Sequence, residues 1–101
     1  MTKEILIDQL VERDGISYEV NSTTPFAGVT LDYDENGQLQ QRSNYKNGKI
    51  DGLYEVFYEN GQLEWRANYK DGKLDGLFEW FDENGNLIKT KEYKNGELIN
   101  G

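Results

Sequence analysis

Apolar and polar residues alternate in short runs over most of the chain, and each run ends at a glycine-containing turn. In the middle of the chain, residues 52–58 and 62–69 alternate in this way on either side of Glu59-Asn60-Gly61. A period of two is typical of a β-strand that turns one face to an apolar surface. Asn-Gly between two such runs favours a two-residue type I′ turn, because that turn needs positive φ at both central residues. The pattern therefore predicts a series of β-hairpins.

This hairpin pattern recurs with a period of 24 residues. One position of the unit is always glycine and another is always tyrosine, as in Gly28, Gly52, Gly76, Tyr45, Tyr69 and Tyr93. A fixed period of this length marks a repeat architecture. We expect one repeat domain over 1–101, made of a non-repeat amino-terminal cap with a hairpin at 1–27, repeats at 28–51, 52–75 and 76–99, and a tail at 100–101.

The predicted fold is all-β: a single twisted antiparallel β-meander of about seven to eight strands, each beside its neighbour in sequence. Two-residue turns at Asn60-Gly61 and Asp71-Gly72 fix the expected register. The first turn places Tyr58 opposite Leu63, Val56 opposite Trp65, Tyr54 opposite Ala67 and Gly52 opposite Tyr69. The second places Tyr69 opposite Leu74, Ala67 opposite Gly76, Trp65 opposite Phe78 and Leu63 opposite Trp80. Both turns assign the same residues to the same face, which supports the register.

Both faces of this sheet are partly apolar. One face carries an aromatic stripe of Tyr54, Tyr58, Trp65, Tyr69, Phe78 and Trp80, with the repeated glycine beneath the tyrosine rings. The other face carries leucine and phenylalanine around a Glu55–Arg66 cross-strand pair. A single-layer sheet cannot bury two apolar faces by itself. We therefore expect residues 1–27 to cover the second face, with a hairpin over residues 10–20. Residues 2–9 fit a strand or a short helix, and Ile5-Leu6-Ile7 favours the strand.

The chain is acidic, with 11 basic and 19 acidic side chains and a net charge of −8. The amino-terminal third, residues 1–37, holds two basic and eight acidic side chains, a net charge of −6. Such a segment repels nucleic-acid phosphates and anionic membranes, and it attracts a basic protein. The simpler interpretation is that the charge only keeps the protein soluble.

The residue types present offer little for catalysis. Without cysteine or histidine there is no disulfide, no thiolate nucleophile and no usual zinc site, and the serines have no evident base. Asp32, Asp34 and Asn36 match the start of a calcium loop, but the twelfth position, which needs a bidentate glutamate, is Ser43. We therefore predict a protein that is not an enzyme and binds no cofactor or metal.

The start of the chain bears on its compartment. The apolar part of residues 1–8 is too short for a signal peptide. We expect a cytoplasmic protein if the chain is complete, and an exported one if a signal peptide has been removed.

The frame Gly52 to Gly76, G-L-Y-E-V-F-Y-E-N-G-Q-L-E-W-R-A-N-Y-K-D-G-K-L-D-G, resembles the variant form of the MORN repeat that is strung together in bacterial YwqK-like proteins. Residues 10–28 resemble the segment that often precedes those repeats. The resemblance implies a protein-binding module, sometimes lipid-binding, and for the YwqK-like group an antitoxin or immunity partner of a toxin. It implies no catalytic residues.

The candidate binding residues are the aromatic stripe and two acids of the first repeat. Trp and Tyr supply much of the binding energy at protein interfaces. Exposed stripe residues near carboxylates would suit a basic, partly apolar partner. The predicted binding residues are Tyr54, Tyr58, Trp65, Tyr69, Phe78, Trp80, Asp32 and Asp34. Packing alone is the competing explanation of the stripe. A surface-exposed or membrane-associated structural protein is the alternative function, and a homodimer through a sheet edge or face is also expected.

Overall fold

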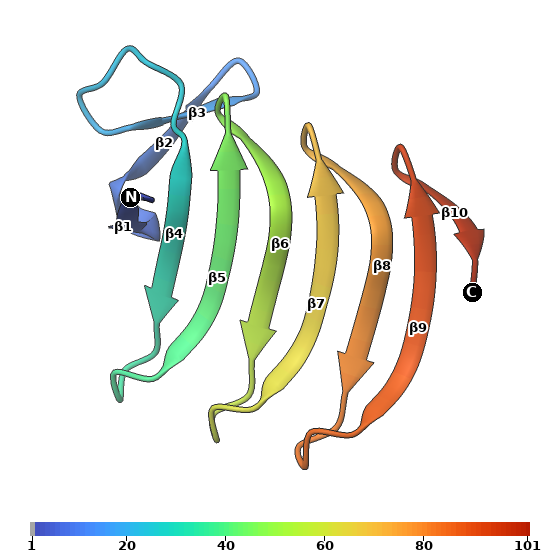
Figure 1. The fold of residues 1–101 in the computed structure, drawn as a ribbon. Helices are drawn as coiled ribbons and strands as arrows, with labels where there is room; N and C mark the ends of the chain where they lie inside the picture. Colours follow the sequence, from blue (N-terminus) through green and yellow to red (C-terminus); the bar gives the residue numbers. More distant parts are fainter. Residues whose placement is uncertain (1) are drawn as a thin grey trace.

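The computed structural model describes residues 2–101; Met1, the first residue of the predicted cap, lies outside this range. Ten strands and one 3₁₀ helix occur in it (Figure 1). They are β1 (Glu4–Leu6), the helix η1 (Ile7–Gln9), β2 (Leu10–Arg13), β3 (Ile16–Glu19), β4 (Gly28–Tyr33), β5 (Leu39–Lys46), β6 (Lys49–Phe57), β7 (Leu63–Lys70), β8 (Lys73–Phe81), β9 (Leu87–Lys94) and β10 (Glu97–Asn100).

The main sheet has eight strands in the order β1-β4-β5-β6-β7-β8-β9-β10, which confirms the all-β class and the meander from β4 onward. The strands lie side by side in one layer (Figure 1). The prediction of a wholly antiparallel sheet is wrong at one edge, because β1 pairs parallel to β4. The predicted hairpin near residue 14 is confirmed as a separate two-stranded sheet of β2 and β3.

Two kinds of turn alternate along the sheet. At the β7–β8 turn both Asp71 and Gly72 have positive φ, 50° and 83°, as a type I′ turn requires. At the β6–β7 turn only Gly61 has positive φ, and its N–H donates to the carbonyl of Tyr58. This is a three-residue turn with glycine in the left-handed region, so the two-residue turn predicted at Asn60-Gly61 is wrong.

The longer turn changes the pairing beside it. Val56 lies opposite Trp65 as predicted, but Leu63 lies opposite Phe57 and not opposite Tyr58. The strand thus ends one residue earlier than expected. Tyr58 is left as the first residue of the turn.

A bulge near the repeated glycine shifts the register between units. Gly76 has a φ of 112°, and the amide of Asn68 donates to the carbonyl of Leu77 at 3.1 Å. Gly52 and Asn44 form the same arrangement one unit earlier. The asparagine amide thus donates a hydrogen bond to a carbonyl that the strand ladder leaves unpaired. The glycine is required by its backbone conformation at the bulge, whereas the sequence had suggested that it accommodates the tyrosine rings.

Because of the bulge, three of the four pairs predicted across β7 and β8 are wrong. Tyr69 lies opposite Leu74 as expected, but Ala67 lies opposite Phe78 and Trp65 lies opposite Trp80. The register is displaced by two residues beyond the bulge, so Leu63 has no partner on β8. An even displacement leaves each side chain on its predicted face.

Successive units are joined by hydrogen bonds from the turn glycine of one unit to the beginning of a strand in the unit before it. The N–H of Gly72 donates to the carbonyl of Ile50, and the N–H of Gly96 donates to that of Leu74. At the amino-terminal end, Gly48 donates in the same way to Phe26, which belongs to no repeat. The cap therefore substitutes for a preceding unit, as terminal segments of repeat arrays do.

The cap covers an edge and one end of the sheet. The β2–β3 hairpin is held to the β5–β6 turn by the hydrogen bond from Ser17 N–H to the carbonyl of Gly48, and it lies beside the top of β4 in Figure 1. Leu53 and Leu77 on the second face stay 36% and 43% exposed. The expectation that residues 1–27 cover that face is therefore wrong for β6 and β8, and residues 4–9 divide between strand β1 and helix η1.

The buried core is small and lies mainly at the amino-terminal end. Among the described residues, the buried apolar side chains are Phe26, Val29 and Ala67. Thr30 and Ser43 are also buried, and their hydroxyl groups form a cross-strand hydrogen bond of 2.6 Å. A sheet with so little enclosed volume leaves most of its apolar side chains in partial contact with water.

Candidate functional site

An aromatic cluster extends across strands β6 to β9 on one side of the sheet. Tyr54 stacks on Trp65 with ring centroids 5.3 Å apart, and Phe78 stacks on Trp80 at 4.0 Å. The centroids of Trp65 and Phe78 are 5.0 Å apart, which joins the two pairs. The ring centroid of Tyr69 lies 5.8 Å from that of Tyr54, and the centroid of Tyr93 lies 6.2 Å from that of Phe78. We define the aromatic face as Tyr54, Trp65, Tyr69, Phe78, Trp80 and Tyr93.

The rings of the aromatic face are packed against one another but remain open to solvent. All six residues are half-buried. The described chain provides no second layer over them, since the cap lies at the other end of the sheet (Figure 1). Rigid aromatic rings that keep part of their surface in water are well suited to contact a partner.

The structure brings together five of the six residues predicted for the aromatic stripe. Tyr58 lies apart at the β6–β7 turn, where its hydroxyl donates to the carbonyl of Phe81 at 2.7 Å. Asp34 also lies at a turn, where its Oδ1 accepts the N–H groups of Asn36 and Gln38 at 2.8 and 2.9 Å. Asp34 therefore has a structural task in the turn.

Asp32 lies on β4 opposite Gln41 and accepts a hydrogen bond from the side-chain amide of Gln40 at 2.7 Å. The same positions in the next two units are Val56 and Trp80. Asp32 is therefore an acidic group at the position that carries apolar side chains later in the sheet.

Two lysines that were not among the predicted binding residues border the other end of the aromatic face. Lys89 lies opposite Trp80 and Lys91 lies opposite Phe78. The ammonium group of Lys89 is 4.9 Å from the centroid of the Trp80 ring, within the range of a cation–π contact. The 24-residue period could have identified these lysines, because the equivalent residues one unit earlier, Trp65 and Ala67, lie on the aromatic side of the sheet.

The opposite face carries a row of charges across the strands. Glu55 lies opposite Arg66 as predicted, and Arg66 also lies opposite Glu79. The ion pair forms with Glu79, at 2.8 Å from Nε to Oε1. Charged groups thus separate the exposed leucines of this face, which makes it less suitable than the aromatic face for an apolar contact.

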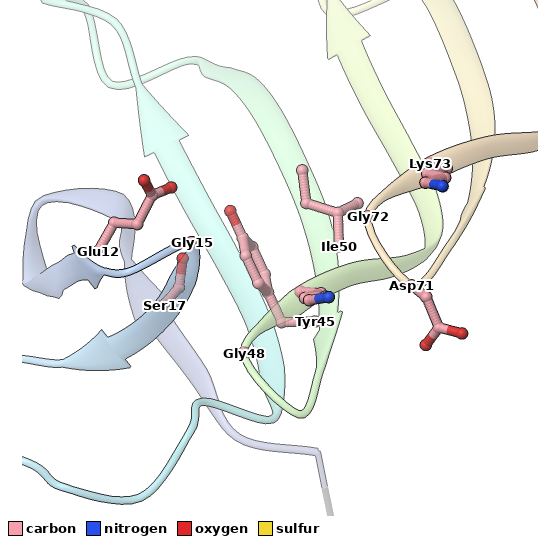
Figure 2. Close-up of a pocket in the computed structure, with 10 residues that line it drawn as sticks. Glu12, Gly15, Ser17, Tyr45, Gly48, Ile50, Asp71, Gly72 and Lys73 are labelled. Atoms are coloured by element: carbon pink, nitrogen blue, oxygen red, sulfur yellow. The ribbon is translucent and has the colours of Figure 1, made fainter. Parts of the chain in front are cut away.

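A cavity of about 350 Å³ lies where the cap meets the sheet. Figure 2 shows the hydroxyl end of Tyr45 between the β2–β3 hairpin, which carries Glu12, and the start of β8, which carries Lys73. Lys49 also lines it. The cavity thus has acidic and basic groups on different walls. Burial raises the pKa of the Tyr45 phenol, and the Glu12 carboxylate acts in the same direction.

Two phenols of the aromatic face, Tyr54 and Tyr69, share this effect. Burial raises the pKa of Tyr54 above its ordinary value, and the neighbouring Tyr45 and Tyr69 contribute in the same direction. Burial also raises the pKa of Tyr69. The raised pKa values mean that the folded sheet favours the neutral phenols.

These pKa shifts predict a loss of stability at high pH. Below about pH 10 the phenols are neutral in both states, and above it the unfolded chain loses the protons first, so the folded state is disfavoured. We expect the free energy of unfolding to fall less steeply from about pH 9 to pH 11 in a Tyr54→Phe/Tyr69→Phe variant than in wild type. Urea titrations at each pH measure this. Tyr33→Phe, at a residue 45% exposed, is the control, and equal slopes in all three proteins would contradict the prediction.

Within residues 2–101, no group of three or more acidic side chains is arranged to hold a metal ion. In the same range, no helix has the length and apolar character needed to cross a membrane.

Three consecutive segments of the chain match the family model of the MORN repeat variant, at residues 28–47, 50–71 and 74–95. Together they account for more than half of the sequence and for strands β4 to β9. No curated protein and no solved structure matches the chain.

Proposed function

The chain belongs to the MORN repeat variant family, and we propose that it is a protein-binding module that holds its partner on the aromatic face. Repeats of this kind generally bind proteins or membranes and form a non-catalytic module. The observation that supports the proposal best is the uncovered aromatic face, which presents two tryptophans, three tyrosines and a phenylalanine on a single-layer sheet.

The charge distribution favours a basic partner. Residues 1–37 have a net charge of −6, and Asp32 lies on β4, which β5 separates from the first strand of the aromatic face. A basic surface would approach this end faster than a neutral one, because opposite charges steer association. The expected partner is therefore basic and partly apolar.

The more specific form of the proposal is an antitoxin or immunity protein that masks a basic toxin domain. It is supported by the resemblance of residues 10–28 and of the repeats to the bacterial YwqK-like proteins. Masking needs only a stable complementary surface, which suits a rigid sheet without catalytic groups.

The test is a pull-down of the protein with the product of the neighbouring gene, followed by co-expression in cells. We expect a stable complex, with binding that weakens as salt is raised because the acidic third contributes to it. Cells that express the neighbouring product should grow only when this protein is present. Absence of a complex together with absence of protection would overturn the antitoxin proposal.

The alternative, a membrane-associated structural protein, has one observation in its favour. The opposite face exposes apolar residues, among them Leu77 at 43% and Ile88 at 63%. The net charge of −8 opposes binding to anionic lipid. Flotation with vesicles containing phosphatidylserine separates the two functions, because tight binding there would contradict the electrostatic argument.

A further inference from the structure

The same five residues, Glu-Asn-Gly-Gln-Leu, occur at two turns of the sheet. They are residues 35–39 between β4 and β5 and residues 59–63 between β6 and β7. An Asn-Gly pair is chemically reactive, because the backbone nitrogen of the glycine can attack the side-chain carbonyl carbon of the asparagine. Glycine has no Cβ atom to obstruct this attack. Since both asparagines have identical neighbours, a difference in reactivity between Asn36 and Asn60 would come from the structure around them.

Several conditions for this reaction are the same at the two turns. Both asparagines are exposed, so water reaches each of them. The N–H of Gly37 donates to the carbonyl of Asp34 at 3.0 Å, and the N–H of Gly61 donates to that of Tyr58 at 2.9 Å. The two glycines have similar φ angles of 79° and 87°. Solvent access and the attacking nitrogen therefore do not distinguish the two sites.

The side chain of Asn60 is held at both of its polar atoms. Its Oδ1 accepts the N–H of Gln62 at 2.9 Å, and its Nδ2 donates to the carbonyl of Glu83 in the β8–β9 turn at 3.0 Å. Reaction requires the side chain to bring its carbonyl carbon to the nitrogen of Gly61. The two hydrogen bonds oppose that rotation, and one of them holds the nitrogen that would leave.

The side chain of Asn36 has no such role, because Asp34 performs it. Oδ1 of Asp34 accepts the N–H groups of both Asn36 and Gln38. The residue equivalent to Asp34 in the next unit is Tyr58, which has no carboxylate, so Asn60 supplies the acceptor there. Among the described residues, the side-chain amide of Asn36 makes no hydrogen bond. Its rotation toward the glycine nitrogen is therefore unopposed.

We propose that Asn36 is a site of spontaneous deamidation in the folded protein, and that Asn60 is protected. The nitrogen of Gly37 loses its proton to hydroxide and bonds to Cγ of Asn36. The bond from Cγ to Nδ2 breaks, and Nδ2 takes a proton from water and leaves as ammonia, which regenerates the hydroxide. One water molecule then opens the succinimide ring at either of its two carbonyl carbons. The products are an aspartate or an isoaspartate residue, and no oxidant or reductant takes part.

Either product places a new carboxylate at the β4–β5 turn, beside Asp34 and Glu35. One such event changes the net charge of residues 1–37 from −6 to −7. The isoaspartate product also adds one carbon atom to the backbone of the turn. The reaction thus makes the acidic third more acidic without an enzyme. It needs no partner and does not depend on the proposed function.

The first experiment compares the two sites within one molecule. The intact protein is incubated at mildly alkaline pH, and peptide mapping by mass spectrometry follows deamidation at residues 36 and 60. We expect Asn36 to react at least about fivefold faster than Asn60, because two hydrogen bonds oppose reaction at Asn60. The same incubation in urea, with unfolding shown by circular dichroism, should give equal rates. Equal rates in the folded protein, no reaction at Asn36, or a difference that persists in urea would overturn the proposal.

Exchanging the residues at positions 34 and 58 tests the cause of the difference. Tyr58→Asp supplies the second turn with a carboxylate that accepts the N–H of Gln62, so Asn60 is released and should react faster. Asp34→Tyr removes the carboxylate from the first turn, so Asn36 should take over its role and react more slowly. A slower reaction cannot result from a loosened fold, because local opening frees the side chain. Unchanged or opposite rates would refute the role assigned to the carboxylate.

Tyr58→Phe is the matched control for the second turn. It keeps the ring and removes only the hydroxyl group that donates to the carbonyl of Phe81. The rates at both asparagines should stay as in the intact protein. A rise at Asn60 equal to that in Tyr58→Asp would show that the tyrosine contact protects the site, which would contradict the explanation by the carboxylate.

Discussion

Gly48→Ala is expected to destabilise the fold far more than Gly72→Ala, although both glycines occupy the same position of a type I′ turn. Their φ angles are 77° and 83°, so alanine meets similar backbone strain at either site. A Cβ atom at residue 48 would lie 2.3 Å from Cγ2 of Ile16 and 2.9 Å from the carbonyl oxygen of Ser17. At residue 72 the nearest atom would be Cβ of Lys49, at 3.8 Å.

The difference between the two variants isolates the packing of the cap against the sheet. Backbone strain alone should cost roughly 1–2 kcal/mol in each variant. Gly48→Ala should add about 1–3 kcal/mol for the displaced hairpin. Urea unfolding followed by tryptophan fluorescence measures both free energies. Hydrogen exchange should also show that residues 10–19 lose protection only in Gly48→Ala; equal losses of stability would contradict the account of the cap.

The sequence predicted the strands and faces well because both depend on alternation and on glycine turns. It did not predict the turn type, since Asn-Gly occurs in two-residue and three-residue hairpins alike. The residues before the Asn-Gly pair did indicate the turn type. Asp34 and Asp82 lie three residues before a glycine, the positions that a type I turn favours for aspartate and glycine. The N–H of Asn86 donates to Asp82, and this hydrogen bond is the main cause of the lowered pKa of that carboxyl.

The register between units needed information that alternation does not contain. The bulge at Gly76 displaces the pairing by two residues, which changes the partner of Trp65 and leaves its face unchanged. For this reason the aromatic surface could be located from the sequence while its cross-strand pairs could not. The repeated Asn68 was a possible indicator, because an amide side chain can bond a carbonyl that the ladder leaves free.

The position of the amino-terminal segment could not be obtained from periodicity, because the segment has none. Its apolar residues required a surface, and the exposed second face was the obvious one. The backbone hydrogen bonds decided otherwise: the N–H of Val29 bonds to the carbonyl of Lys3, and Ser17 bonds to Gly48. Satisfying the polar groups of an edge and a turn prevailed over covering apolar side chains.

Trp80→Ala is expected to weaken partner binding strongly while Leu77→Ala leaves it nearly unchanged. Trp80 lies opposite Trp65, stacks on Phe78 at 4.0 Å and contacts the ammonium group of Lys89. Loss of a tryptophan at the centre of an interface costs about 2 kcal/mol or more, which corresponds to a roughly 30-fold weaker complex. Leu77 is three residues earlier on the same strand, 43% exposed on the opposite face, and it controls for general effects on the sheet.

Titration calorimetry with the product of the neighbouring gene provides the affinities, and urea unfolding provides the stability of each variant. Trp80→Phe is the second control, because it keeps a ring against Phe78 and should retain more of the affinity than alanine. The aromatic face is supported only if affinity falls in the order wild type, Trp80→Phe, Trp80→Ala while each variant remains folded at the temperature of the measurement. The reverse result, with Leu77→Ala weakening the complex and Trp80→Ala leaving it intact, would assign the partner to the opposite face. The half-buried aromatic rings would then serve only to hold the single-layer sheet together.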